Sequence, residues 1–184
     1  ILLFNVDFIP GGREIDVILI HEDIGVFIIE VKGVGIDSIL SISPTNWCIE
    51  NRDTSESPVV QSYRQYEGLR DFLKPHIRRL PFIAVTACLP KVQRQQWMER
   101  YQHSAYAQSI TKSLIFEDDL YSGTPVLMDR LRWIHSNPPI RQGKDVRPVS
   151  HEFLDSLRRI LEPAQPVLPT LSERERLAAL ERGI

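Results

Sequence analysis

The chain has 184 residues, of which 42% are hydrophobic and 25% are charged, and its formal net charge is −2 at pH 7. This size and composition are typical of a folded globular protein and exclude a fibrous or highly charged disordered chain. No apolar run reaches the roughly 20 residues that a membrane-spanning helix needs, so we expect no membrane contact. The slightly negative charge counts mildly against nucleic-acid binding, because domains that bind nucleic acid are often basic.

The first part of the chain predicts a meander of three antiparallel strands. Apolar and β-branched residues indicate strands at residues 2–9, 14–20 and 26–32. Pro10-Gly11-Gly12 marks the first turn, and residues 21–25 form the second.

Charged residues interrupt the second and third strands where a strand core is normally apolar. Side chains alternate between the faces of a strand, so Glu14 and Asp16 share one face, as do Glu30 and Lys32. A five-residue turn sets Asp16 opposite Glu30 and Glu14 opposite Lys32. The sequence therefore predicts three carboxylates and one ammonium at one end of a hairpin.

Two interpretations of this charged hairpin are open. A Glu–Lys pair at a strand end is an ordinary stabilising contact, worth roughly 0.2–1 kcal/mol. One ammonium does not balance three carboxylates, however, and unpaired carboxylates are costly to bury. Hard oxygen ligands are the ones that Mg²⁺ takes, so the pattern favours a divalent cation site.

A helix and a buried strand are predicted after the meander. The helix begins near Pro58, with Ser57 as its N-cap, and an apolar stripe continues to Ile77. The nearly unbroken apolar run at residues 80–89 is typical of a central, parallel strand. A strand–helix–strand crossover places that strand beside the charged hairpin.

The remaining elements alternate between helix and strand. Residues 51–57 are expected to be polar and exposed, and the acidic residues 117–119 are interpreted as a loop leading to a helix rather than a metal site. Residues 36–42 are expected to form a fourth strand or to begin a loop. Short strands are expected at residues 47–49 and 114–116, and helices at 91–106, 126–135 and 152–161. Arg64, Arg94 and Arg100 are either phosphate contacts or charges on solvated helix faces, and we favour the second interpretation.

Two cysteines, Cys48 and Cys88, are far apart and lie in apolar runs. Their spacing matches neither a zinc site nor a redox motif. Buried free thiols are therefore expected, which suits a reducing cytoplasmic setting.

The hairpin carries a resemblance to a known family. Asp16 followed across a turn by Glu30-Val31-Lys32 resembles the PD-(D/E)XK nuclease signature. The fuller stretch, Glu14-Ile15-Asp16 and then Gly25 to Gly33, resembles the nuclease-related domain (NERD) family. That family also has an Asn-Pro pair followed by a Gln on a helix. Here the matching run is Ser57-Pro58-Val59-Val60-Gln61, with Ser in place of Asn.

The resemblance implies a fold and a reaction. The fold is α/β, with a restriction-endonuclease-like central mixed sheet and an antiparallel catalytic hairpin, flanked by helices. The reaction is Mg²⁺-dependent hydrolysis of DNA phosphodiester bonds, with Mn²⁺ as a substitute, in DNA processing or defence.

The resemblance also implies site roles. Asp16 and Glu30 bind the metal, with the Val31 carbonyl and Glu14 as further ligands. Lys32 orients the attacking water or stabilises the transition state, and Gln61 positions the site.

The sequence leaves two other functions and one boundary open. The chain could instead be a catalytically silent nucleic-acid-binding module of a larger helicase-type or kinase-type protein, or a structural domain with an ion-pair cluster. Residues 1–162 are expected to form the domain. Residues 163–184 are expected to form a Pro-rich linker and a short helix that lead to a missing domain.

Overall fold

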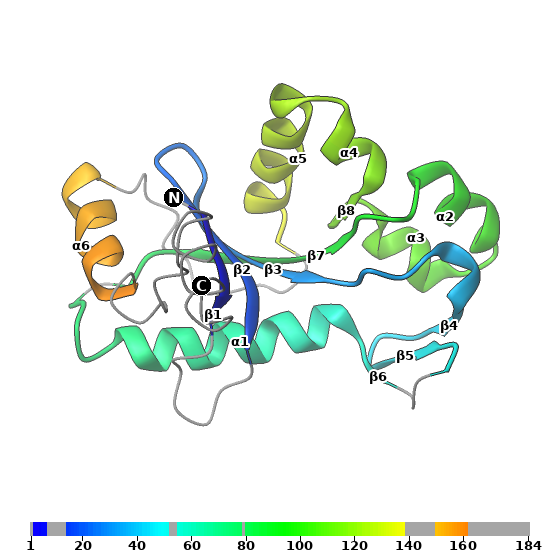
Figure 1. The fold of residues 1–184 in the computed structure, drawn as a ribbon, viewed down its shortest axis with the longest axis horizontal. Coiled ribbons are helices and arrows are strands. Elements are labelled where there is room, and N and C mark those ends of the chain that lie inside the picture. Colours follow the sequence, from blue (N-terminus) through cyan, green and yellow to red (C-terminus); the bar gives the residue numbers. More distant parts are fainter. Residues whose placement is uncertain (1, 7–13, 52–54, 79, 139–149, 162–184) are drawn as a thin grey trace, which may run out of the picture.

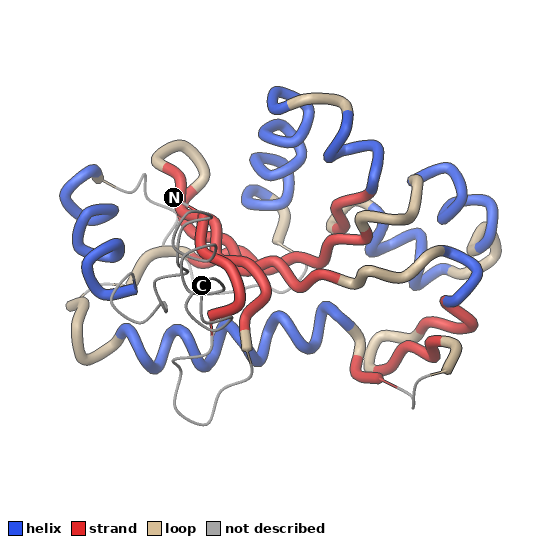
Figure 2. The backbone as a smooth tube through the Cα atoms, viewed as in Figure 1, coloured by secondary structure: helices blue, strands red, loops and turns tan. Residues whose placement is uncertain are grey.

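The computed structural model describes residues 2–6, 14–51, 55–78, 80–138 and 150–161. Within these ranges the chain forms one five-stranded sheet with the strand order β1-β2-β3-β7-β8. A separate three-stranded sheet, β4-β5-β6, lies beyond the N-terminal end of the long helix α1 (Figure 1). Figure 2 shows that the strands of the larger sheet run through the middle of the molecule, with helices on both sides.

The predicted meander is confirmed. Strand β2 (Ile15–His21) pairs antiparallel with both β1 (Leu2–Val6) and β3 (Gly25–Val31). In the β2–β3 ladder Val17 lies opposite Ile29, so one further step in the same register brings Asp16 beside Glu30. Gly25 closes the turn with a φ of 73°, a conformation that favours glycine.

The parallel half of the sheet begins after helix α1 (Pro58–Leu73). Strand β7 (Ile83–Leu89) is buried along its whole length and pairs parallel with β3, as predicted. Strand β8 (Leu114–Phe116) pairs parallel with β7. The sheet is thus mixed, with an antiparallel hairpin and flanking helices, which is consistent with a restriction-endonuclease-like fold.

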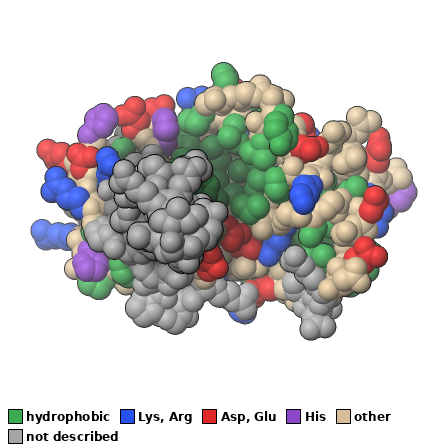
Figure 3. Space-filling view, in the orientation of Figure 1, with side chains coloured by type: hydrophobic (Ala, Val, Ile, Leu, Met, Phe, Trp, Pro, Cys, Tyr) green, Lys and Arg blue, Asp and Glu red, His purple; other side chains and the backbone are tan. Residues whose placement is uncertain are grey.

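Helices cover the two faces of the sheet unequally. On one face, α1 and α6 (His151–Leu161) pack against alternate residues of β2, β3 and β7. On the other face, α5 (Thr124–Ser136) packs against the intervening residues of β3 and β7. The space-filling view shows a hollowed band of apolar side chains on the molecular surface, with acidic side chains at its border (Figure 3).

The smaller sheet follows the hairpin. A single 3₁₀ turn (Ile36–Ser38) leads into β4 (Ile39–Ile42), which pairs with β5 (Asn46–Ile49). Strand β6 (Ser55–Glu56) pairs with β5, so the expectation of an exposed polar loop at residues 51–57 is wrong for this part. Ser57 is fully buried at the start of α1.

Three helical predictions need correction. The expected helix at residues 91–106 is two helices, α2 (Arg94–Arg100) and α3 (Ala105–Thr111), because Ser104 caps a new helix start through the backbone N–H of Ala107. Helix α1 ends at Leu73 rather than near residue 77, since Pro75 has no backbone N–H to donate to the carbonyl of Asp71.

The third correction concerns the acidic residues 117–119. They do not form a loop but begin helix α4 (Glu117–Tyr121), where negative charge is favourable at a helix N-terminus.

Some predictions lie outside the described residues. They are residues 7–9 of the first predicted strand, the first turn at residues 10–12, and the linker and helix at residues 163–184. In the described part of the chain, no helix has the length and apolar character required to cross a membrane.

Candidate functional site

The site is centred on Lys32, which follows the last residue of β3. Its Nζ donates hydrogen bonds to Glu30 Oε1 at 2.7 Å and to Gln61 Oε1 at 2.9 Å. The first partner lies on the same strand and the second on the first turns of α1. The backbone N–H of Lys32 bonds the Cys88 carbonyl of β7 at 2.9 Å, which fixes the end of β3 against the parallel sheet.

Glu30 is a charged residue in a buried position, with a relative exposure of 2%. Burial raises the pKa of its carboxyl above the usual range, while the hydrogen bond and charge of Lys32 oppose that rise. The negative charge of Asp16 also raises the pKa, and the hydrogen bond from Gln65 lowers it. Both Glu30 oxygens are held, because Gln65 Nε2 donates to Oε2 at 2.7 Å.

Asp16 joins the cluster from β2. Its Oδ2 accepts a 2.6 Å hydrogen bond from the backbone N–H of Val31. The side chain therefore crosses from one strand of the hairpin to the next and lies beside the Glu30–Lys32 pair. The contact uses the amide of Val31, and the predicted role of the Val31 carbonyl as a metal ligand stays a prediction.

The structure thus brings together the side chains of Asp16, Glu30, Lys32 and Gln61. Within the part of the chain that the structure describes, the side chain of Glu14 has no hydrogen bond to this group. Glu14 is exposed immediately before β2, and its backbone carbonyl accepts a 2.8 Å bond from Gln65 Nε2. No three His, Cys, Asp or Glu side chains among the described residues are arranged to hold a metal ion. The structure gathers two of the three predicted carboxylates.

The donor set fits Mg²⁺ despite this smaller number of carboxylates. In phosphoryl-transfer sites Mg²⁺ is usually held by one or two carboxylates together with substrate phosphates and waters. Asp16 and Glu30 supply two carboxylates, and each carboxylate oxygen has a second lone pair beyond its hydrogen bond to the protein.

The sequence prediction missed Gln65. This residue is 2% exposed and contacts Glu30 directly. A signal for it was present, because Gln61, Gln65, Leu69 and Leu73 are four residues apart and so lie on one face of α1. A glutamine in line with two core leucines indicates a polar group that faces inward.

Arg64, a candidate contact to a DNA phosphate, lies outside the cluster. Its side chain is exposed and forms a 2.9 Å ion pair with Glu56.

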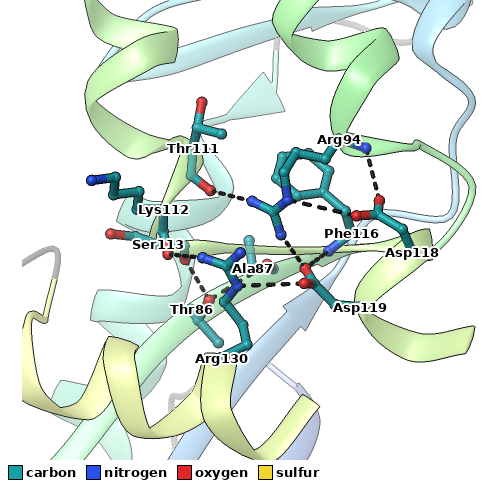
Figure 4. Close-up of polar contacts among 10 residues, drawn as sticks. All are labelled: Thr86, Ala87, Arg94, Thr111, Lys112, Ser113, Phe116, Asp118, Asp119 and Arg130. Carbon is teal, nitrogen blue, oxygen red and sulfur yellow. Dashed lines mark hydrogen bonds and ion pairs between the residues drawn. The ribbon is translucent and has the colours of Figure 1, made fainter. Parts of the chain in front are cut away.

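A second charge cluster, the Arg94–Asp119 network, is built around the buried Asp119 near the end of β8 (Figure 4). Asp119 Oδ2 accepts hydrogen bonds from the Arg94 guanidinium and from the Phe116 backbone N–H, and Oδ1 faces Arg130 Nε at 3.4 Å. Asp118 accepts a 2.8 Å bond from the Arg94 backbone N–H.

These contacts join α2, α4 and α5. Arg94 also lies over the Phe116 ring at 4.7 Å, so the expectation of a solvated Arg94 is wrong.

The comparison with protein families agrees with this geometry. The family model described as nuclease-related domain matches residues 1–89. The match supports a nuclease-related domain in this part of the chain. This part of the chain contains β1 to β7 and α1, and with them every residue of the candidate site. No curated protein and no solved structure matches the chain.

The matched residues therefore include the β2–β3 hairpin, helix α1 and the first parallel strand, β7. The Arg94–Asp119 network lies after the matched residues. The candidate site thus lies inside the matched residues, and the Arg94–Asp119 network lies outside them.

Proposed function

We propose that this chain is a metal-dependent nuclease that hydrolyses DNA phosphodiester bonds, with the Asp16–Glu30–Lys32–Gln61 cluster as its active site. The setting that we propose is cytoplasmic DNA processing or defence. An attached helicase-type or kinase-type domain is the proposed partner.

One observation carries this proposal. Two carboxylates and one ammonium are gathered beside the end of β3, which leaves the cluster with one net negative charge in a largely buried position. The Lys32 side chain is only 12% exposed, so solvent screens these charges weakly. A divalent cation would offset the remaining charge, and Asp16 and Glu30 are the residues that would hold it.

A bound Mg²⁺ would supply an activated water and charge stabilisation at the phosphate. Lys32 has three N–H donors, of which two bind Glu30 and Gln61. The third is the group that would orient the attacking water or stabilise negative charge on a phosphate oxygen in the transition state. Gln61 would keep the Lys32 ammonium pointing toward the substrate.

A silent binding module is the second candidate. Both oxygens of Glu30 already accept hydrogen bonds from the protein, which favours a cluster that is stable without a metal. Such a module would bind DNA through its surface and leave cleavage to an attached domain.

Cleavage assays distinguish the two candidates. Supercoiled plasmid and a labelled single strand are incubated with the wild type and with Lys32→Ala, in Mg²⁺, in Mn²⁺ and in chelator. We expect metal-dependent cutting by the wild type and a loss of at least about 100-fold in Lys32→Ala, the scale of removing one transition-state donor.

Lys74→Ala is the matched control, because Lys74 is an exposed lysine at the C-terminal end of α1, far along the helix from Gln61, and it pairs with Asp71. It removes the same charge without touching the cluster, so cutting should be unchanged. DNA binding without cutting by the wild type would overturn the nuclease and support the binding module.

A further inference from the structure

Gln65 connects three parts of the candidate site. From α1, its Nε2 donates to Glu30 Oε2 on β3 at 2.7 Å and to the carbonyl of Glu14 before β2 at 2.8 Å. The residue is 2% exposed. One amide group therefore ties the helix to the site ends of both hairpin strands.

The orientation of this amide follows from its partners. A backbone carbonyl and an ionised carboxylate only accept hydrogen bonds, so the Gln65 nitrogen must face them. Its Oε1 then points elsewhere, and it is a buried atom without a hydrogen-bond partner among the described residues. An unsatisfied buried acceptor is unfavourable for folding, and an apolar side chain of the same length would avoid it.

We propose that Gln65 is a positioning residue of the active site, one that holds the Glu30 carboxylate from the helix side while Lys32 holds it from the strand side. This inference rests on the proposed function. Lys32 alone is an insufficient support, because it bonds only Oε1 of Glu30 and leaves Oε2 without a donor. With Gln65 in place, each Glu30 oxygen has its own donor, and the carboxylate cannot rotate away from Asp16.

Loss of this support should weaken metal binding. Partners that orient a metal ligand typically contribute about 10–100-fold to metal affinity or activity. In Gln65→Met, the side chain keeps its length and loses both donors. We expect the dissociation constant for Mn²⁺, measured by electron paramagnetic resonance of the free ion, to rise by about tenfold.

The Mg²⁺ concentration for half-maximal cutting should rise in parallel. The rate at saturating Mg²⁺ should fall less, because the metal itself then holds Glu30.

Leu69→Val is the control for a general loss of stability. Leu69 lies one turn further along α1, is fully buried and packs in the core rather than on the site. It should lower the melting temperature and leave Mn²⁺ affinity unchanged. A Gln65→Met protein with wild-type Mn²⁺ affinity and wild-type Mg²⁺ dependence would overturn the inference.

A metal-free measurement separates this inference from the proposed function. Urea unfolding of the wild type, Gln65→Met, Glu30→Leu and the double variant forms a thermodynamic cycle. If Gln65 holds Glu30, the effects on the unfolding constant should depart from a simple product by about fivefold or more. Independent effects would overturn the positioning role. Absence of both Mn²⁺ binding and DNA cutting in the wild type would instead overturn the metal-dependent nuclease.

Discussion

The Asp16–Glu30–Lys32–Gln61 cluster lies near the carboxyl end of β3, and the Arg94–Asp119 network lies near the carboxyl end of β8. Strand β7 separates the two. In the network, two carboxylates face two guanidinium groups, so the charges balance. In the cluster, the one ammonium pairs with Glu30, while Asp16 accepts a hydrogen bond from the neutral N–H of Val31, and burial raises the pKa of Glu30. The comparison teaches that two partly buried charge clusters in one sheet can differ in charge balance, and the unbalanced one is the site that we propose to be functional.

The largest expected effect is the loss of folding stability when the balanced network is broken. Asp119→Ala leaves Arg94 and Arg130 partly buried without their shared carboxylate. Removing one partner of a buried pair typically costs about 3–5 kcal/mol, and we expect that loss in the free energy of unfolding measured in urea. Asp129→Ala, which removes an exposed pair with Arg132, should change it by less than about 1 kcal/mol. A loss in Asp119→Ala that Mg²⁺ restored would contradict the structural role of the network.

The next effect tests whether the cluster is incomplete without a cation. A ligand at 100 times its dissociation constant stabilises the folded state by about 2.7 kcal/mol. We expect saturating Mg²⁺ to raise the melting temperature of the wild type accordingly and to leave Asp16→Asn unchanged. An equal rise in both proteins would place the bound ion elsewhere and remove the distinction between the clusters.

A smaller effect concerns pH. Because burial raises the pKa of Glu30 from 4.5, the folded state binds its proton more tightly than the unfolded state does. The stabilisation from this proton is fully present below pH 4.5 and is lost as pH rises through the raised pKa.

In metal-free protein the unfolding free energy of the wild type should therefore fall relative to that of Glu30→Gln as pH rises above 4.5. Denaturant titrations over that interval measure the difference. A constant difference would show that burial does not disfavour the Glu30 charge.

The smallest expected effect is on the alkylation rate of Cys88, which lies on β7 between the two clusters. Cys88 on β7 pairs with Val31 on one side and Ile115 on the other, and burial raises the pKa of its thiol to about 12. Since the thiolate is the reactive form, iodoacetamide at neutral pH should alkylate the partly exposed Cys48 well before Cys88. Mass spectrometry of labelled peptides gives both rates. Asp119→Ala should speed labelling of Cys88, because the negative charge of Asp119 also raises the pKa of this thiol and because the network no longer holds the neighbouring strand. Glu30→Gln should leave the rate unchanged.

Much of the fold could be predicted because its signals are local. Alternation along the hairpin, a turn ending at Gly25 and the unbroken apolar run of β7 each depend on a few neighbouring residues. The two-residue strand β6 could not be found in this way, because its pairing with β5 is a tertiary contact within a polar segment. The break between α2 and α3 depended on a single serine cap.

The site was only partly predictable for a related reason. Strand alternation and register placed Asp16 beside Glu30 and Lys32 from sequence alone. The same pattern also placed Glu14 in the group, yet Glu14 precedes the paired residues of β2 and is exposed. The Gln65 contact and the Arg94–Asp119 pair join residues 35 and 25 positions apart, and local patterns carry no information about such distances.

Insertions and deletions in helix α1 should disturb this site, because the helix fixes how its side chains are oriented. Each helical residue turns the chain by about 100°, so residues at intervals of four form one stripe. In α1 that stripe begins with two glutamines at the cluster and ends with two leucines in the core. A one-residue insertion after Gln65 would turn both amides away while the leucines kept their places. A one-residue deletion there would rotate the two amides away in the opposite direction. The number of residues in α1 is therefore as important to the site as the side chains that the helix carries.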